Sequence, residues 1–146
     1  MPTVAETAFI AHPTATVFAV AADPKLQLQW DAPTLRRVEQ LTPGPLARGA
    51  RYRGNFKGFG TVTYEFAEFE PGHSFQHVAR IPMGEMRHRL TFEEAAGGTR
   101  LTQHGELRPN LVGRLLAPFV MSMLRKRFRT VADELNAYLA STPRVD

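Results

Sequence analysis

A long stretch of alternating apolar and polar residues, from Leu35 to Arg108, constrains the fold of this chain more than any other feature. Alternation with a period of two places successive side chains on opposite faces of a β-strand. Glycines and prolines interrupt the alternation and mark tight turns at residues 42–45, 58–60, 70–72, 82–84 and 96–98. The segment therefore predicts six strands connected as an antiparallel meander.

The residues on either side of the meander predict one more strand and three helices. Residues 4–11 are strand-like, and short helices are expected to begin near Pro13 and after Asp23. In the C-terminal segment, apolar residues recur at steps of four and three at Leu124, Phe128, Val131, Leu135 and Tyr138. This spacing predicts an amphipathic helix that begins after Asn110 as N-cap and ends near Ala140, with a kink or restart at Pro118.

These elements define the expected fold class. A sheet with one apolar face and a single long helix bury both apolar surfaces when the sheet wraps around the helix. We therefore expect an α+β helix-grip fold: a curved antiparallel sheet of about seven strands around a long C-terminal helix, with two short helices after the first strand. The length suits a single domain over residues 1–146.

Facing charges predict the register of the last hairpin. If Phe92 pairs with Leu101, apolar residues share one face of the sheet and opposite charges meet on the other. The resulting charge pairs are Glu93–Arg100, Arg87–Glu106 and Glu85–Arg108.

Two other hairpins have a predicted register as well. In the hairpin before the last one, Ile81 pairs with Gly84 across a turn at residues 82–83. In the hairpin around Gly58, the prediction sets Phe56 against Val62. That register places Gly54 opposite Tyr64, Tyr52 opposite Phe66, and Arg53 opposite Glu65.

Two histidines face one another in these registers. His77 lies opposite His88 on the apolar face, and Gly105 lies beside His88. Paired imidazoles in an apolar pocket are expected to have lowered pKa values, which leaves at least one of them neutral near pH 7. The pair can act as a general acid and base on a carbonyl substrate, or it can only orient a bound ligand, and the sequence leaves both readings open.

The remaining candidate contacts share the inward face or the helix that covers it. Three of them, Tyr52, Tyr64 and Gln103, bring polar tips to an apolar wall, as expected of a small-molecule pocket. Trp30 either closes the mouth of the cavity or plugs the end of the sheet. The other expected ligand contacts are Phe66, Phe75 and Leu90 on the strands and Phe119, Met123 and Leu124 on the helix.

Composition excludes several classes of function. The chain has no cysteine, which excludes a disulfide framework, a thiolate zinc site and a cysteine nucleophile. The other histidines, His12, His73 and His104, are expected at a strand end, in a turn and on the outer face, so they form no metal site with the facing pair. We expect no metal and no cofactor.

The net charge of +4 is not gathered into a recognisable nucleic-acid-binding motif. The one dense basic run, residues 125–127 with Arg129, is interpreted as the solvated face of the C-terminal helix, so no nucleic acid is expected as a partner. No stretch approaches the ~18 apolar residues of a membrane span, and the N-terminus lacks a signal-peptide pattern. We expect a cytoplasmic protein without stable membrane insertion.

Several short stretches carry a resemblance to a known family: residues 10–18, 23–30, 69–72, 98–102 and 111–113. With the order of elements, they resemble the START-like, or SRPBCC helix-grip, superfamily in its polyketide cyclase/dehydrase-like branch. The resemblance covers nearly the whole chain. It implies a cavity between sheet and helix for a small hydrophobic or aromatic molecule, and it implies no particular reaction.

Three functions therefore stay open. The first is binding of a polyketide-, lipid- or steroid-like ligand in the cavity. The second is a cyclase or dehydratase activity based on His77 and His88, and whether the chain is an enzyme is left undecided. The third is an interaction module that docks an acidic partner on the basic helix. Both a monomer and a homodimer are compatible with the sequence.

Overall fold

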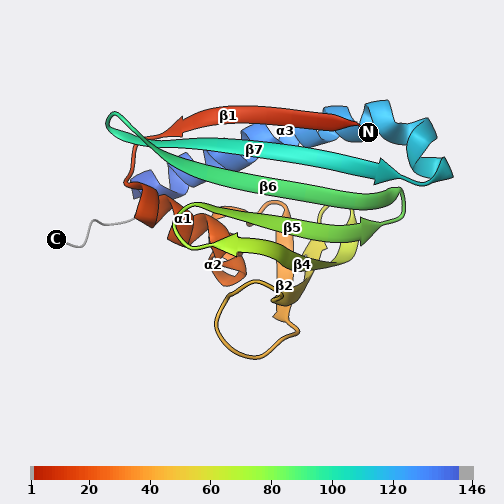
Figure 1. The fold of residues 1–146 in the computed structure, drawn as a ribbon, viewed down its shortest axis with the longest axis horizontal. Coiled ribbons are helices and arrows are strands. Elements are labelled where there is room, and N and C mark those ends of the chain that lie inside the picture. The colour runs from red at the N-terminus through yellow and green to blue at the C-terminus, as the bar shows by residue number, and fades with distance from the viewer. Residues whose placement is uncertain (1, 142–146) are drawn as a thin grey trace.

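One seven-stranded antiparallel sheet organises the computed structural model, which describes residues 2–141. The strand order is β1-β7-β6-β5-β4-β3-β2, so β2 to β7 form the predicted meander and β1 pairs with β7 (Figure 1). The strands are β1 (Thr3–Ile10), β2 (Leu35–Gln40), β3 (Arg51–Phe56), β4 (Gly60–Glu70), β5 (Ser74–Ile81), β6 (Gly84–Ala95) and β7 (Gly98–Pro109).

Three helices complete the fold and confirm the helix-grip prediction. The helices α1 (Thr14–Ala22) and α2 (Pro24–Trp30) lie together at one end of the sheet, and α3 (Leu111–Ser141) runs along the sheet against β1 and β7. The side chain of Asp23 accepts a hydrogen bond from the Lys25 N–H at 2.9 Å, and Pro24 occupies the first turn of α2. Both features are favourable at the beginning of a helix, which explains why α2 starts here.

The helix α3 begins as the sequence predicts. Asn110 caps it, because its side-chain oxygen accepts a hydrogen bond from the Gly113 N–H at 2.8 Å. Pro118 does not restart the helix, which is one element from Leu111 to Ser141. A proline removes only one helical hydrogen bond, here to the carbonyl of exposed Arg114, and the first turns of α3 run at an angle to the rest (Figure 1).

Two of the three predicted registers are confirmed. Phe92 pairs with Leu101 between β6 and β7, and Ile81 pairs with Gly84 between β5 and β6. All three predicted charge pairs are therefore cross-strand neighbours. One of them, Glu85–Arg108, is an ion pair at 3.6 Å, and the same two side chains also pair along their own strands with Arg87 and Glu106.

The predicted register of the β3–β4 hairpin is wrong by two residues. Phe56 pairs with Gly60, Gly54 with Val62, and Tyr52 with Tyr64. The loop is shorter than predicted, because Gly58 and Gly60 adopt positive φ angles of 90° and 76° and permit a tight turn at residues 57–59. A shift by an even number of residues preserves the faces, so the three aromatic side chains Tyr52, Tyr64 and Phe66 remain buried.

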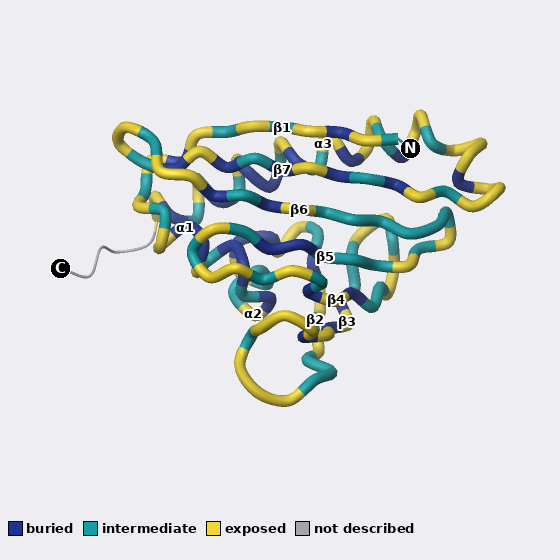
Figure 2. Tube along the Cα trace, viewed as in Figure 1, coloured by how far each residue is buried: buried dark blue, intermediate teal, exposed yellow. Residues whose placement is uncertain are grey.

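The core lies between the sheet and α3, with a cluster of aromatic rings where α1 covers the sheet. Phe18 on α1 contacts Phe75 and Phe92 with ring centroids 5.8 and 5.3 Å apart. Along β7, buried residues alternate with more exposed ones (Figure 2). At Gly105, a side chain would place its Cβ 2.8 Å from the Phe128 ring, so glycine lets α3 approach β7 closely.

Candidate ligand-binding cavity

A cavity of about 160 Å³ lies between the sheet and α3. Side chains from all three helices and from β3 to β6 line it, and most of them are apolar. The lining residues are Ala21, Gln27, Trp30, Phe56, Val62, Tyr64, Phe75, His77, Ala79, Met86, His88, Leu90, Leu124, Arg127, Phe128 and Val131.

Most of the candidate residues lie in or directly behind this wall. Seven of them line it: Trp30, Tyr64, Phe75, His77, His88, Leu90 and Leu124. Tyr52, Phe66 and Gln103 are buried behind the wall. Tyr52 stacks on Tyr64 with centroids 6.0 Å apart, and the Phe66 ring lies 4.5 Å from that of His77, so these residues support the lining side chains.

The predicted contacts Phe119 and Met123 are wrong. Both residues are on the outer side of α3, where 75% and 41% of their surface is exposed. Their neighbours Val120 and Leu124 point inward instead. Because both sides of the helix are apolar here, the helical period alone cannot tell which set faces the cavity.

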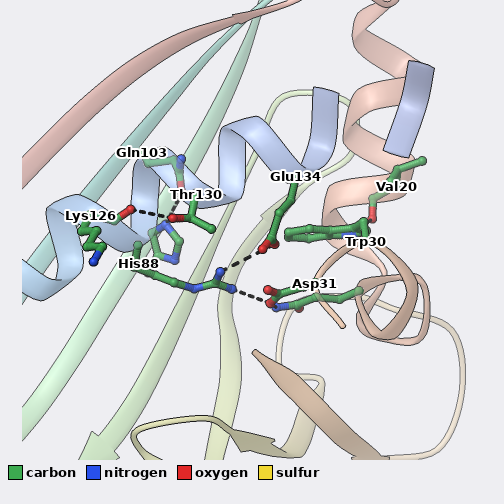
Figure 3. Close-up of polar contacts among 10 residues, drawn as sticks. Val20, Trp30, Asp31, His88, Gln103, Lys126, Thr130 and Glu134 are labelled. Atoms are coloured by element: carbon green, nitrogen blue, oxygen red, sulfur yellow. Dashed lines mark hydrogen bonds and ion pairs between the residues drawn. The ribbon is translucent and has the colours of Figure 1, made fainter. Parts of the chain in front are cut away.

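His77 and His88 are direct neighbours on the adjacent strands β5 and β6, and their ring centroids are 6.4 Å apart in the cavity wall. His88 is held on two sides. Its ring stacks on that of Phe128, with centroids 4.4 Å apart and an interplanar angle of 10°. Its Nε2 lies 3.1 Å from Oε1 of Gln103 (Figure 3).

The hydrogen bonds of Gln103 determine the tautomer of His88. The amide nitrogen of Gln103 donates to the carbonyl oxygen of Phe128 at 2.7 Å, and a carbonyl can only accept. The amide oxygen of Gln103 therefore faces His88 and accepts a hydrogen bond from Nε2–H. His88 thus carries its proton on Nε2 and leaves Nδ1 as the unprotonated nitrogen.

Both imidazoles are neutral at pH 7. Burial, with a smaller effect from His88, lowers the pKa of His77 to about 3. Burial also lowers the pKa of His88 to about 4, although the hydrogen bond with Gln103 opposes this change. Both residues are half-buried, and both line the cavity.

Besides Nη1 of Arg127, which lies 3.8 Å from Glu134, two polar atoms in the wall are buried with no hydrogen-bond partner among the described residues. They are the hydroxyl of Tyr64 and Nε2 of His77, on adjacent strands with ring centroids 4.9 Å apart. Burial, with a smaller effect from Tyr52, raises the pKa of Tyr64 above its usual value, so its hydroxyl stays protonated and can donate. The two atoms form a small polar site in a mostly apolar wall.

Arg127 lines the cavity and forms ion pairs with two acidic side chains. It contacts Asp31, which is fully buried at the end of α2. Its Nη1 also lies 3.8 Å from Glu134, about two turns further along α3 (Figure 3). Gln27 donates a second hydrogen bond to Asp31 at 2.9 Å. Burial, then the hydrogen bond and charge of Asp31, raise the pKa of Glu134 to about 7.

The interpretation of the basic run as a solvated face is therefore wrong for Arg127. Arg125 and Arg129, which are exposed, both pair with Glu6 on β1. The sequence does carry a signal for the inward position of Arg127. Arg127 follows Leu124 by three residues and precedes Val131 by four, so it lies on the same side of the helix as these two apolar residues.

The histidines and acidic side chains of residues 2–141 do not gather into a metal site. Within this range no three potential ligands from histidine, aspartate or glutamate converge. His73 and His104 are exposed and His12 is half-buried at the end of β1. No helix of the described part of the chain is long and apolar enough to cross a membrane.

Solved structures with the same fold come from several sources. Protein MLL2253 from Mesorhizobium loti is 16% identical, with a TM-score of 0.77 over 98% of this chain and 100% of that one. Ara h 8.0201 is 13% identical, with a TM-score of 0.77 over 97% and 99%. DynU16, a protein in the dynemicin biosynthetic locus, is 19% identical with a TM-score of 0.73 over 95% of this chain, which spans 47% of DynU16. At such identities the similarity shows the fold alone.

A search among curated protein sequences finds no match. The family described as polyketide cyclase / dehydrase and lipid transport, in contrast, matches residues 1–140. That match covers nearly the whole chain and agrees with the observed sheet, helices and cavity. The chain therefore belongs to the polyketide cyclase / dehydrase and lipid transport family.

Proposed function

We propose that the chain binds a small, flat, hydrophobic molecule with one hydrogen-bonding group in the cavity between the sheet and α3. The observation that carries this proposal is the unpartnered pair formed by the Tyr64 hydroxyl and His77 Nε2 in an apolar wall. A buried polar group without a partner costs about 1–3 kcal/mol, and a ligand that supplies the partner recovers part of that energy. The pair therefore favours a ligand with a hydroxyl or carbonyl group.

The size of the cavity narrows the class of ligand further. A volume of about 160 Å³ is close to that of an engineered protein cavity that holds one benzene molecule, roughly 150 Å³. One or two fused aromatic rings fit this space better than a steroid or a phospholipid does. Burial of their surface at ~25 cal/mol per Å² makes micromolar affinity reachable.

The electrostatics of the wall favour a neutral ligand over an anion. His77 and His88 are neutral at pH 7, and the charge of Arg127 is shared by Asp31 and Glu134. No net positive charge therefore remains at the cavity to offset the desolvation of a bound carboxylate.

A cyclase or dehydratase activity is the second candidate, supported by two neutral imidazoles in the wall, one of them in a fixed tautomer. A general base works best when its pKa lies near the working pH. With pKa values of about 3 and 4, both imidazoles are weak bases at pH 7. Binding without turnover is therefore the better account of this site.

Two matched compounds test the proposed polar contact. We expect 2-naphthol to bind more tightly than 2-methylnaphthalene, which has a methyl group of similar size in place of the hydroxyl. In Tyr64→Phe and His77→Phe, the affinity for 2-naphthol should fall up to roughly tenfold, the value of one hydrogen bond, while that for 2-methylnaphthalene should hold or rise. Titration calorimetry measures both affinities.

His73→Gln, in the exposed turn between β4 and β5, serves as the control that changes a histidine away from the cavity. Equal affinities for the two compounds in all variants would show that the Tyr64 and His77 pair does not select the ligand. If neither 2-naphthol nor 2-methylnaphthalene binds the unmodified protein, the ligand proposal itself is wrong. Turnover of a poly-β-carbonyl compound that is lost in His77→Phe would favour the enzyme.

A further inference from the structure

The first turns of α3 carry an exposed apolar surface that the cavity does not use. We call it the front patch, and it consists of Leu111, Val112, Leu115, Leu116, Phe119 and Met123. Leu111, Leu115 and Phe119 follow one another at steps of four residues and are each at least 75% exposed. At the end of the molecule where α3 begins, the exposed colour dominates the helix (Figure 2).

The opposite side of the same turns is also apolar, because Gly113, Val120 and Leu124 are buried against the sheet. The helix is therefore apolar on both sides up to Met123, with Arg114 and Ser122 as exceptions. Beyond that point its exposed positions turn polar, as in Arg125, Lys126, Arg129 and Asp133. A helix that is apolar all round is normally covered, and a contiguous exposed patch marks a surface that meets a partner.

The front patch is held rigidly. The backbone N–H of Asn110 donates to the Met83 carbonyl at 3.1 Å, and the Asn110 side chain donates to the Pro82 carbonyl at 2.9 Å. Gly113 lies so close to the β5–β6 turn that a Cβ atom would be 1.9 Å from the Met83 oxygen. The exposed side chains therefore stand on a helix end fixed to the sheet.

The charges that α3 itself carries beside the front patch are all positive. Arg114 lies within the patch, Lys126 lies one turn beyond Met123, and neither forms an ion pair with any residue from 2 to 141. No acidic residue occurs between positions 110 and 132. Leucine and phenylalanine side chains flanked by lysine and arginine are typical of helices that lie on anionic membrane surfaces.

We propose that the front patch docks the protein on the surface of a lipid bilayer that contains anionic lipids. The apolar side chains enter the boundary between headgroups and acyl chains, and Arg114 and Lys126 contact the headgroups. A second copy of this chain fits less well, because it would bring the same unpaired cations together between two molecules of net charge +4. The proposal does not depend on what the cavity binds.

Sedimentation with vesicles tests the docking surface. We expect the protein to bind vesicles of phosphatidylcholine and phosphatidylserine at 3:1, to bind phosphatidylcholine vesicles far more weakly, and to be released by 0.5 M NaCl. Leu115→Ser with Phe119→Ser should reduce the partition at least tenfold. Arg114→Ser and Lys126→Ser should each reduce it roughly fivefold.

Matched controls lie at the opposite end of the sheet. Phe9→Ser removes an exposed phenylalanine from β1, and Arg100→Ser removes an exposed cation from its cross-strand neighbour on β7. Neither should change vesicle binding more than about twofold. Because all substituted side chains are exposed, the unfolding midpoints should stay close to that of the unmodified protein.

Three results would overturn the proposal. One is that the unmodified protein does not bind anionic vesicles. Another is binding that the Leu115→Ser, Phe119→Ser variant retains. The third is that the unmodified protein binds no vesicles but forms a dimer in analytical ultracentrifugation without lipid, and that the Leu115→Ser, Phe119→Ser variant is a monomer. That result would identify the front patch as an interface between two copies.

Discussion

Replacement of Arg127 by methionine is expected to lower the free energy of unfolding by about 3–5 kcal/mol and the unfolding midpoint by roughly 10 °C. Arg127 lies between Asp31, which is fully buried, and Glu134, whose side chain is 17% exposed. Without the guanidinium, two carboxylates would face each other in a space that already raises the pKa of Glu134 to about 7. Methionine replaces the aliphatic part of the arginine side chain, so the loss reflects the missing charge and hydrogen bond more than packing.

The matched control for this variant is Arg125→Met on the same helix. Arg125 is exposed and lies 3.7 Å from Glu6, so its loss should cost less than about 1 kcal/mol. Adding Glu134→Gln to Arg127→Met should restore part of the stability, because one uncompensated carboxylate disappears. If chemical denaturation finds equal losses for Arg127→Met and Arg125→Met, the buried ion pairs do not stabilise the junction of α2 and α3.

Mild acid is the second condition with a large expected effect. The folded state keeps His77 and His88 neutral down to pH values of about 3 and 4, whereas in the unfolded chain a histidine binds a proton near pH 6.5. The unfolded state therefore binds more protons below pH 6.5, and stability falls as the pH falls. Each histidine lowers the free energy of unfolding by up to about 1.4 kcal/mol for each unit that the pH falls.

Glu134 opposes this trend between pH 4.5 and pH 7. Its pKa is raised in the folded state, so there the folded state holds a proton that the unfolded chain has lost. The two histidines outweigh this one group. The free energy of unfolding should therefore fall by about 1.4 kcal/mol for each unit that the pH falls between 6.5 and 4.5. Urea denaturation across this range measures the slope.

Two variants should change that slope in opposite directions. His77→Phe removes one histidine and should nearly flatten the dependence, while Glu134→Gln removes the opposing group and should steepen it to about 2.8 kcal/mol per pH unit. His73→Gln should leave the slope as it is. An unchanged slope in His77→Phe would show that protonation of this ring does not govern the stability in acid.

The sheet could be predicted from the sequence because two independent patterns agree along β6 and β7. Apolar residues alternate with charged ones, and only one register brings opposite charges such as Glu93 and Arg100 together. The β3–β4 hairpin lacks such a constraint. There the register depends on the length of the loop, and the tight turn at Gly58 could not be distinguished from a longer one.

The candidate site was predictable on the sheet side and much less so on the helix side. A period of two settles which side chains face inward, so His77 and His88 were correctly placed opposite one another. On α3, apolar residues occur on both sides up to Met123, and this ambiguity led to the wrong placement of Phe119. The partner of Arg127, Asp31, lies 96 residues away and only the folded chain brings them together.

The strict alternation along β5 and β6 separates two properties of the protein. Outward residues such as Arg87 and Glu85 carry charges that meet opposite charges on β7 in the observed register. Inward residues such as His77 and His88 form the cavity wall. A substitution at an inward position changes what the cavity accepts and leaves the outward charges in place. Over evolutionary time, ligand preference and strand alignment can therefore diverge separately in such a sheet.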